Sequence, residues 1–201
     1  VNPIFVGNFV DDSKFTLKND CTNRDIFNLF TVGLASKRKD FPNLLKALHV
    51  LIYKYEQRDI ILTLSIPEKF SDGISMSELK INDYCRFVSN LSLHDLVHEY
   101  QKADLFVSSS YFETFGVAVC EAMSCGTPVV AVNNGGIDDI INYNNGIRID
   151  IGDYENMAEA ILKVKNKTIV FDKNRVRESI VEKFGRKAFF DKISSIYNSF
   201  S

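Results

Sequence analysis

The sequence lacks an excess of charge of either sign and lacks a long apolar run. Its 201 residues contain 24 Lys and Arg against 26 Asp and Glu, for a formal net charge of −2. A dedicated nucleic-acid binder usually carries a basic excess, so this balance argues against that class. The most apolar stretch, residues 44–55, is interrupted by Lys46, His49 and Lys54, which argues against a membrane-spanning helix. A hydrophobic content of 45% and a charged content of 25% are ordinary for a soluble globular domain.

Cysteine and histidine are few, and their spacing does not suit a metal site. The four cysteines form no C-x-x-C pair: Cys21, Cys85, Cys120 and Cys125. This favours isolated thiols in a reducing compartment over a disulfide framework or a zinc site. His94 and His98 are four residues apart in a predicted helix, but only neighbouring carboxylates could complete a metal site. We interpret both as residues of the helix surface.

Three familiar phosphate-binding patterns are also missing. No G-x-G-x-x-G follows the first predicted strand, and no G-x-x-x-x-G-K-[ST] occurs. There is no D-x-D, the simplest arrangement for holding a divalent ion against a diphosphate. An anionic ligand would therefore have to be bound by basic side chains and helix N-termini.

What the sequence does contain is a regular alternation of short β-branched runs and amphipathic stretches. The runs predict strands at residues 26–33, 60–66, 86–89, 104–108, 129–132 and 147–151. Helical periodicity and end signals predict helices at residues 42–55, 93–102, 117–124, 154–165, 174–183 and 186–197. This alternation predicts one α/β domain with a Rossmann-like, doubly wound and mainly parallel sheet. Such sheets bind ligands beyond the carboxyl ends of their strands.

A basic loop follows the first predicted strand. The run Ser36-Lys37-Arg38-Lys39 precedes the first helix, where three cations beside a helix N-terminus would suit a phosphate group. A solvated basic turn is the alternative interpretation, and the loop taken alone favours it.

The helix predicted at residues 117–124 contains Glu121 among small and apolar residues. A helix this apolar should be buried, and a buried carboxylate needs hydrogen-bond donors. Ligand hydroxyls or an internal partner, such as a serine or a backbone amide, would both serve. Glu113 lies in the preceding loop, near the positive end of the helix. Glu113 and Glu121 are eight positions apart, which corresponds to about 12 Å along a helix. The two carboxyl groups of a glycosidase lie closer together than this, so we favour two separate contacts on one extended ligand.

The segment from Glu113 to Ala131 resembles the E-x7-E signature of group 1, family 4 glycosyltransferases. It reads ETFGVAVCE followed by AMSCGTPVVA. The similarity extends to the strand at 103–107, the loop and helix at 33–45, the opening segment at 6–15 and the final helices at 184–197. The resemblance implies one lobe of a GT-B fold. Residues 1–201 would form the carboxyl-terminal, donor-binding domain, with the amino-terminal acceptor domain outside this chain.

The resemblance also implies an activity. The family moves a sugar, with retention and without a metal or other cofactor, from a nucleotide-diphosphate sugar such as a UDP- or GDP-sugar. The acceptor would be a saccharide or a lipid-linked saccharide, in the synthesis of a surface polysaccharide or glycolipid. The expected location is cytoplasmic, at the inner face of the membrane for a peripherally associated full-length enzyme, and the isolated domain is expected to be inactive. The alternatives are a non-catalytic nucleotide-sugar-binding or scaffolding module and an epimerase-like GT-B protein.

Roles for individual residues follow from the resemblance. Glu113 would be the catalytic residue, binding hydroxyls of the donor sugar, and Glu121 would accept hydrogen bonds from the ribose. Arg38 and Lys39 would neutralise the leaving diphosphate. The other implied donor contacts lie in loops and at a helix N-terminus: Asn90, Leu91, Thr114, Phe115, Gly116 and Val117.

The sequence departs from the family pattern at four positions. Leu34 stands where Arg is common, with Arg38 as its expected compensation, and Thr114 stands where Gly is common. Ser109 replaces a usual Pro, and Ile66 replaces a frequent Gly. These departures leave nucleotide binding expected and its strength open.

Overall fold

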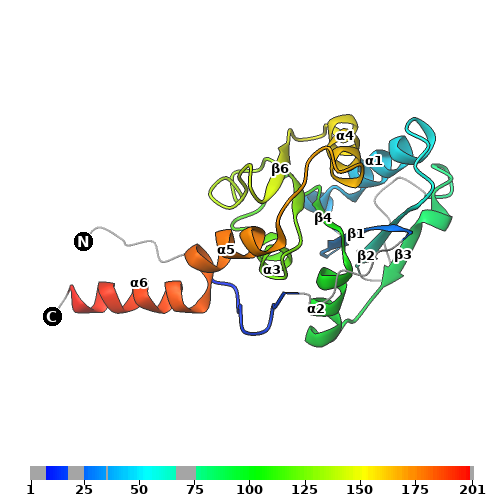
Figure 1. Ribbon diagram of the computed structural model, residues 1–201. Coiled ribbons are helices and arrows are strands. Elements are labelled where there is room, and N and C mark those ends of the chain that lie inside the picture. Colours follow the sequence, from blue (N-terminus) through cyan, green and yellow to red (C-terminus); the bar gives the residue numbers. More distant parts are fainter. Residues whose placement is uncertain (1–7, 18–24, 35, 67–75, 200–201) are drawn as a thin grey trace.

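The computed structural model describes residues 8–17, 25–34, 36–66 and 76–199 (Figure 1). Cys21 and the first two residues of the predicted opening segment lie outside these ranges. Six parallel strands form one sheet: β1 (Phe27–Val32), β2 (Ile60–Ser65), β3 (Cys85–Val88), β4 (Leu105–Ser108), β5 (Val129–Val132) and β6 (Gly146–Ile149). Their order is β3-β2-β1-β4-β5-β6. The predicted parallel sheet is confirmed, and each strand lies within two residues of its predicted bounds.

The helices also lie close to their predicted positions. They are α1 (Phe41–Tyr53), α2 (Leu93–Lys102), α3 (Val117–Ser124), α4 (Tyr154–Lys165), α5 (Lys173–Phe184) and α6 (Arg186–Asn198). Two short 3-10 helices are η1 (Lys37–Lys39) and η2 (Asn82–Tyr84). Helix α1 begins with Pro42 in its first turn, where the missing N–H costs no hydrogen bond.

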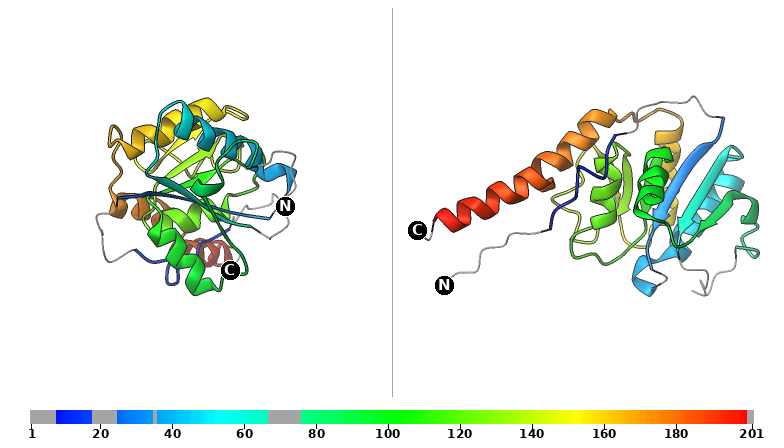
Figure 2. Two further views of the ribbon diagram at one scale, coloured as in Figure 1. Left: turned by 90° about the vertical axis from the view of Figure 1, so that its right-hand side faces the viewer. Right: turned by 90° about the horizontal axis from the view of Figure 1, so that it is seen from below.

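Helices cover both faces of the sheet (Figure 2), and an apolar core lies beneath them on each face. One core contains the buried faces of α1 and α4, and the other contains those of α2, α3 and α5. Strands covered on both sides read as continuous apolar runs, as in Val129–Val132, whose four residues are all buried. The doubly wound architecture is therefore confirmed.

Local signals in the sequence set where the helices begin. The side chains of Ser92, Asp153 and Asp172 accept hydrogen bonds from backbone N–H groups in the first turns of α2, α4 and α5. Helix α3 begins differently, after Gly116 in the left-handed region at φ 79°. A Cβ atom there would lie 2.9 Å from Cγ2 of Ile137, so both conformation and space require glycine.

Helix α6 extends from the body of the domain beside the described start of the chain (Figures 1 and 2). A parallel bridge between Val10 and Gly185 joins the two segments, and the rings of Phe9 and Phe189 lie 4.9 Å apart. Arg177 of α5 ties the start of the chain to the body, because its guanidinium donates to the backbone carbonyls of Asp12, Phe15 and Ser124.

Three of the four cysteines lie in the described ranges. Cys120 and Cys125 are buried, Cys85 is half-buried, and all three are free thiols. His94 and His98 are exposed on α2, as predicted. Within the described ranges, no three His, Cys, Asp or Glu side chains are grouped as a metal site would require. None of the helices in these ranges is both long and apolar enough to cross a membrane.

Candidate active site

The loops after β1 and β4 meet at the carboxyl edge of the sheet, where the strand order reverses. Ser109 Oγ donates a hydrogen bond to the Lys39 carbonyl at 2.7 Å, and Ser110 Oγ donates to the Arg38 carbonyl at 3.0 Å. The backbone N–H of Tyr111 donates to the same Arg38 carbonyl, also at 3.0 Å. Both serines are buried, so these bonds are sheltered from water. The basic loop is therefore held to the loop that carries Glu113.

An ion pair joins the same two loops. Lys39 Nζ lies 2.6 Å from Oε1 of Glu113, and the two side chains are 24% and 21% exposed. Gly33, directly after β1, leaves room for the lysine side chain, because a Cβ atom there would lie 2.8 Å from Lys39 Cε. The structure thus brings together a cation predicted to bind diphosphate and the carboxylate predicted to bind the donor sugar. Arg38, one residue earlier, is exposed at the same edge.

The turn after β5 also contacts the loop that carries Glu113. Asn134 donates from Nδ2 to the Ser110 carbonyl at 2.8 Å, and its Oδ1 accepts from the Gly136 N–H at 3.2 Å. A Cβ atom on Gly136 would lie 2.2 Å from the carbonyl oxygen of Glu113. This close approach requires glycine, and it fixes the backbone that carries the carboxylate.

The residues predicted to offer backbone donors lie just before α3 and at its first residue. Thr114 and Val117 are exposed, and Gly116 is buried at the N-cap. The Phe115 ring packs edge-on against Phe184 of α5, with centroids 5.2 Å apart, so its side chain anchors the loop. The first N–H groups of a helix lack intrahelical partners and carry partial positive charge. The end of α3 is therefore suited to anionic oxygens.

Glu121 lies one turn further along α3 and is partly buried. The hydroxyl of Tyr100, on α2, donates a hydrogen bond to Oε2 of Glu121 at 2.8 Å. Burial raises the pKa of Glu121, and the bond from Tyr100 opposes that rise. An internal partner therefore exists, although it is a tyrosine rather than the serine or amide considered from the sequence. Oε1 of Glu121 accepts no hydrogen bond from the described residues.

Asn90 and Leu91 follow β3, at the same edge but two strands away from β1. Asn90 is exposed with φ 52°, a left-handed conformation that asparagine tolerates better than most residues. In the described part of the chain, neither residue is hydrogen-bonded or ion-paired to the cluster around Lys39 and Glu113. Leu34, at one position of departure from the family pattern, is 73% exposed, whereas Ile66, at another, is buried.

Several residues that support the predicted site residues are not themselves among those predicted from the sequence. They are Tyr100, Ser109, Ser110, Asn134 and Gly136. The need of Glu121 for a donor was the one available signal for Tyr100. Three consecutive serines at the end of a buried strand are a weaker signal, because only the tertiary structure shows which carbonyls their hydroxyls reach.

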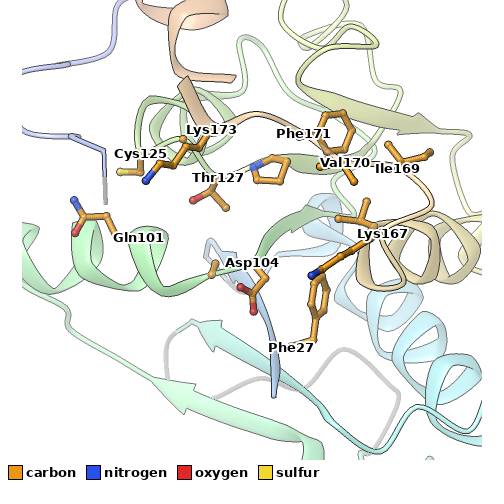
Figure 3. A pocket seen from close by; sticks show the side chains of 14 residues that line it. Phe27, Gln101, Asp104, Cys125, Thr127, Lys167, Ile169, Val170, Phe171 and Lys173 are labelled. Atoms are coloured by element: carbon orange, nitrogen blue, oxygen red, sulfur yellow. The ribbon is translucent and has the colours of Figure 1, made fainter. Parts of the chain in front are cut away.

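A separate cavity of about 390 Å³ lies at the opposite, amino-terminal edge of the sheet (Figure 3). Phe27, Asp104 and Thr127 line it from the residues that begin or precede strands, and Val170 and Phe171 line it from the segment before α5. None of the predicted site residues lines this cavity. It is therefore distinct from the cluster at the carboxyl edge.

A family model described as "Glycosyl transferases group 1" matches residues 22–183. The chain belongs to this glycosyltransferase family. The predicted signature from Glu113 to Ala131 lies within the matched residues, so the family resemblance inferred from the sequence is confirmed.

Two curated relatives illustrate the similarity of this glycosyltransferase chain to known proteins. The capsular polysaccharide biosynthesis glycosyltransferase CapM of Staphylococcus aureus is 25% identical over 195 residues, which cover 95% of this chain and 51% of CapM. A D-inositol 3-phosphate glycosyltransferase of Corynebacterium jeikeium is 29% identical over 141 residues, covering 66% of this chain and 34% of that protein. The chain thus spans about half the length of CapM and about a third of the length of the Corynebacterium jeikeium protein.

Solved structures of glycosyltransferases share the fold. A glycosyltransferase from Rickettsia africae has a TM-score of 0.83 at 18% identity, covering 98% of this chain and 56% of that one. Anabaena HepE, solved in complex with UDP, has a TM-score of 0.79 at 18% identity, covering 95% of this chain and 56% of that one. These likenesses confirm that this glycosyltransferase chain has the Rossmann-like fold of a GT-B lobe.

Proposed function

We propose that this chain binds a nucleotide-diphosphate sugar at the carboxyl edge of the sheet. It would supply the donor side of a retaining sugar transfer that uses no metal cofactor. The observation that carries the proposal is the pairing of Lys39 with Glu113 at the point where the strand order reverses. One group suits a diphosphate and the other suits sugar hydroxyls, so a donor bound there would meet both at adjacent positions.

Each group has a distinct part in this proposal. Lys39 and Arg38 bind the diphosphate and stabilise the charge that develops on it as the glycosidic bond breaks. The N–H groups of Phe115, Gly116 and Val117 face the sugar and diphosphate, and Thr114 is a further contact to the donor. Glu113 binds hydroxyls of the donor sugar near the reacting carbon.

The nucleoside end of the donor would lie further along the same edge. Glu121 accepts hydrogen bonds from the ribose hydroxyls, and the backbone at Asn90 and Leu91 contacts the base. The solved complexes of HepE with UDP and UDP-glucose support a uridine nucleotide as the first donor to test.

The acceptor is part of the proposal as well. CapM is named for capsular polysaccharide biosynthesis, which supports a saccharide or lipid-linked acceptor in surface polysaccharide or glycolipid synthesis. We place this activity in the cytoplasm, at the inner face of the membrane. Because the matched relatives are about twice as long as the aligned region, we expect the 201-residue chain alone to bind the donor without transferring its sugar.

The test is calorimetry of the chain with UDP, GDP and ADP, followed by the corresponding sugar nucleotides. We expect one diphosphate to bind with a stoichiometry of one and its sugar nucleotide to bind more tightly. Failure of all three to bind at millimolar concentration would overturn the proposal. Release of free sugar from the bound donor would instead overturn the expectation that the chain alone is inactive.

A further inference from the structure

Tyr100 is the largest fully buried side chain of the domain in the described ranges, and its ring is held on several sides. The rings of Phe15, Phe30 and Phe106 surround it, with centroid separations of 6.0, 5.1 and 5.5 Å. Its backbone carbonyl accepts a hydrogen bond from Thr127 Oγ1 at 2.7 Å. Close packing of this kind leaves the ring one orientation, and the hydroxyl therefore has a fixed direction.

That direction is toward Glu121. The hydroxyl donates to Oε2 at 2.8 Å, which links α2 to α3. A carboxylate can accept several hydrogen bonds on its two oxygens, so one donor does not saturate it. The bond fixes the rotation of the carboxylate and leaves Oε1 without a partner among the described residues.

We propose that Tyr100 is a positioning residue that holds Glu121 ready for the ribose hydroxyls of a bound nucleotide. This inference rests on the proposed function, in which Glu121 binds the ribose. Tyr100 takes one oxygen of the carboxylate, and the ribose diol donates to the other. The carboxylate is already ordered in the folded protein, so nucleotide binding costs less side-chain conformational entropy.

The surroundings of Glu121 make its protonation state sensitive to Tyr100. Burial raises the pKa of Glu121, and the hydroxyl counters this by stabilising the carboxylate. Among the described residues, the other titratable neighbours are Cys120 and Cys125, whose thiol pKa values burial raises to about 12, and the charge of Arg177 on α5 acts on Cys125. Both thiols are neutral near pH 7, so the tyrosine is the neighbour whose loss would most directly favour protonation of Glu121.

The variant Tyr100→Phe removes the hydroxyl and keeps the ring. Tyr55→Phe is the matched control, because the Tyr55 hydroxyl also donates to a glutamate, Glu159, at 3.2 Å, but away from the site. Calorimetry would compare UDP with 2′,3′-dideoxy-UDP between about pH 5 and 8. If GDP or ADP binds better, the same pair is made with that base.

We expect wild type to prefer the ribose nucleotide to its dideoxy counterpart. Tyr100→Phe should lose about fivefold in affinity for the ribose nucleotide, the size of one hydrogen bond, and nothing for the dideoxy form. On acidification, Tyr100→Phe should lose nucleotide binding at a higher pH than wild type does, because the pKa of Glu121 is higher without the hydroxyl. Tyr55→Phe should retain both the preference and the pH profile.

The outcomes separate this inference from the proposed function. If wild type binds both nucleotides equally, the ribose role of Glu121 in the proposed function fails, and this inference fails with it. If wild type discriminates and Tyr100→Phe discriminates equally well, the proposed function stands and the role of Tyr100 is overturned. If Tyr100→Phe does not fold, a fluorinated tyrosine at position 100, a stronger donor, should move the acidic loss of binding to lower pH. An unmoved profile would overturn the inference.

Discussion

The ion pair between Lys39 and Glu113 means that the cation proposed to bind the diphosphate is already paired with a carboxylate. A diphosphate must therefore displace or share that carboxylate when it binds to the lysine. Glu113→Gln removes the competing charge and keeps the size of the side chain. We expect this variant to bind the preferred diphosphate, whether UDP, GDP or ADP, more tightly than wild type does.

The magnitude follows from the exposure of the pair. Its atoms are 2.6 Å apart, but its side chains remain 24% and 21% exposed, so water screens the attraction. Exposed pairs contribute up to about 1 kcal/mol, and we take that upper value for this partly buried one. This amounts to roughly a fivefold gain in diphosphate affinity for Glu113→Gln.

Calorimetry at one ionic strength would measure the gain, with the nucleoside alone as an internal reference that should not change. Glu155→Gln is the matched control, because it removes the same charge from an exposed ion pair. Glu155 lies on α4, and its Oε1 is 3.8 Å from Nζ of Lys54. The variant Glu113→Gln should also lose the preference for the sugar nucleotide over the diphosphate. Weaker diphosphate binding to Glu113→Gln would refute the idea that Glu113 competes for Lys39.

Three further outcomes are expected. Lys39→Ala should weaken diphosphate binding at least about tenfold and leave nucleoside binding unchanged; calorimetry showing equal losses for both would remove Lys39 from its role. Gly136→Ala should lower the free energy of unfolding by about 1–3 kcal/mol, since its Cβ would meet the Glu113 carbonyl; an unchanged denaturant midpoint would contradict that contact. Glu121→Gln should raise Tm at pH 7, because burial raises the pKa of Glu121 in the folded chain. The contribution of Glu121 to the free energy of unfolding therefore falls as pH rises above 4.5. Thermal melts should show this advantage narrowing as pH approaches 4.5, and a constant difference would contradict it.

Much of the fold could be predicted from the sequence because its signals are local. Val129–Val132 is a short apolar run that fits a strand buried on both faces, and Ser92 marks the start of α2 as an N-cap. The bounds of α2, α3, α4 and β5 match their predictions residue for residue. The order of the strands was not predicted, because it depends on how the crossovers pack rather than on any one segment.

The candidate site was predictable to a smaller extent. Glu113 and Glu121 stand out as charges in an apolar region, and Lys39 stands out in a basic loop. Their partners did not stand out, because a hydrogen bond such as that from Tyr100 to Glu121 joins residues 21 positions apart on different helices. The Lys39–Glu113 pair spans 74 positions, and only the meeting of β1 and β4 in the sheet brings it together.

The central claim is that a nucleotide-diphosphate sugar binds at the carboxyl edge, between the loops after β1 and β4. A crystal structure of the chain with the diphosphate that calorimetry identifies would test it most directly. We predict the diphosphate beside Lys39 and the N-terminus of α3, with the ribose against Glu121. A nucleotide bound elsewhere, for example in the cavity at the amino-terminal edge, would contradict the account.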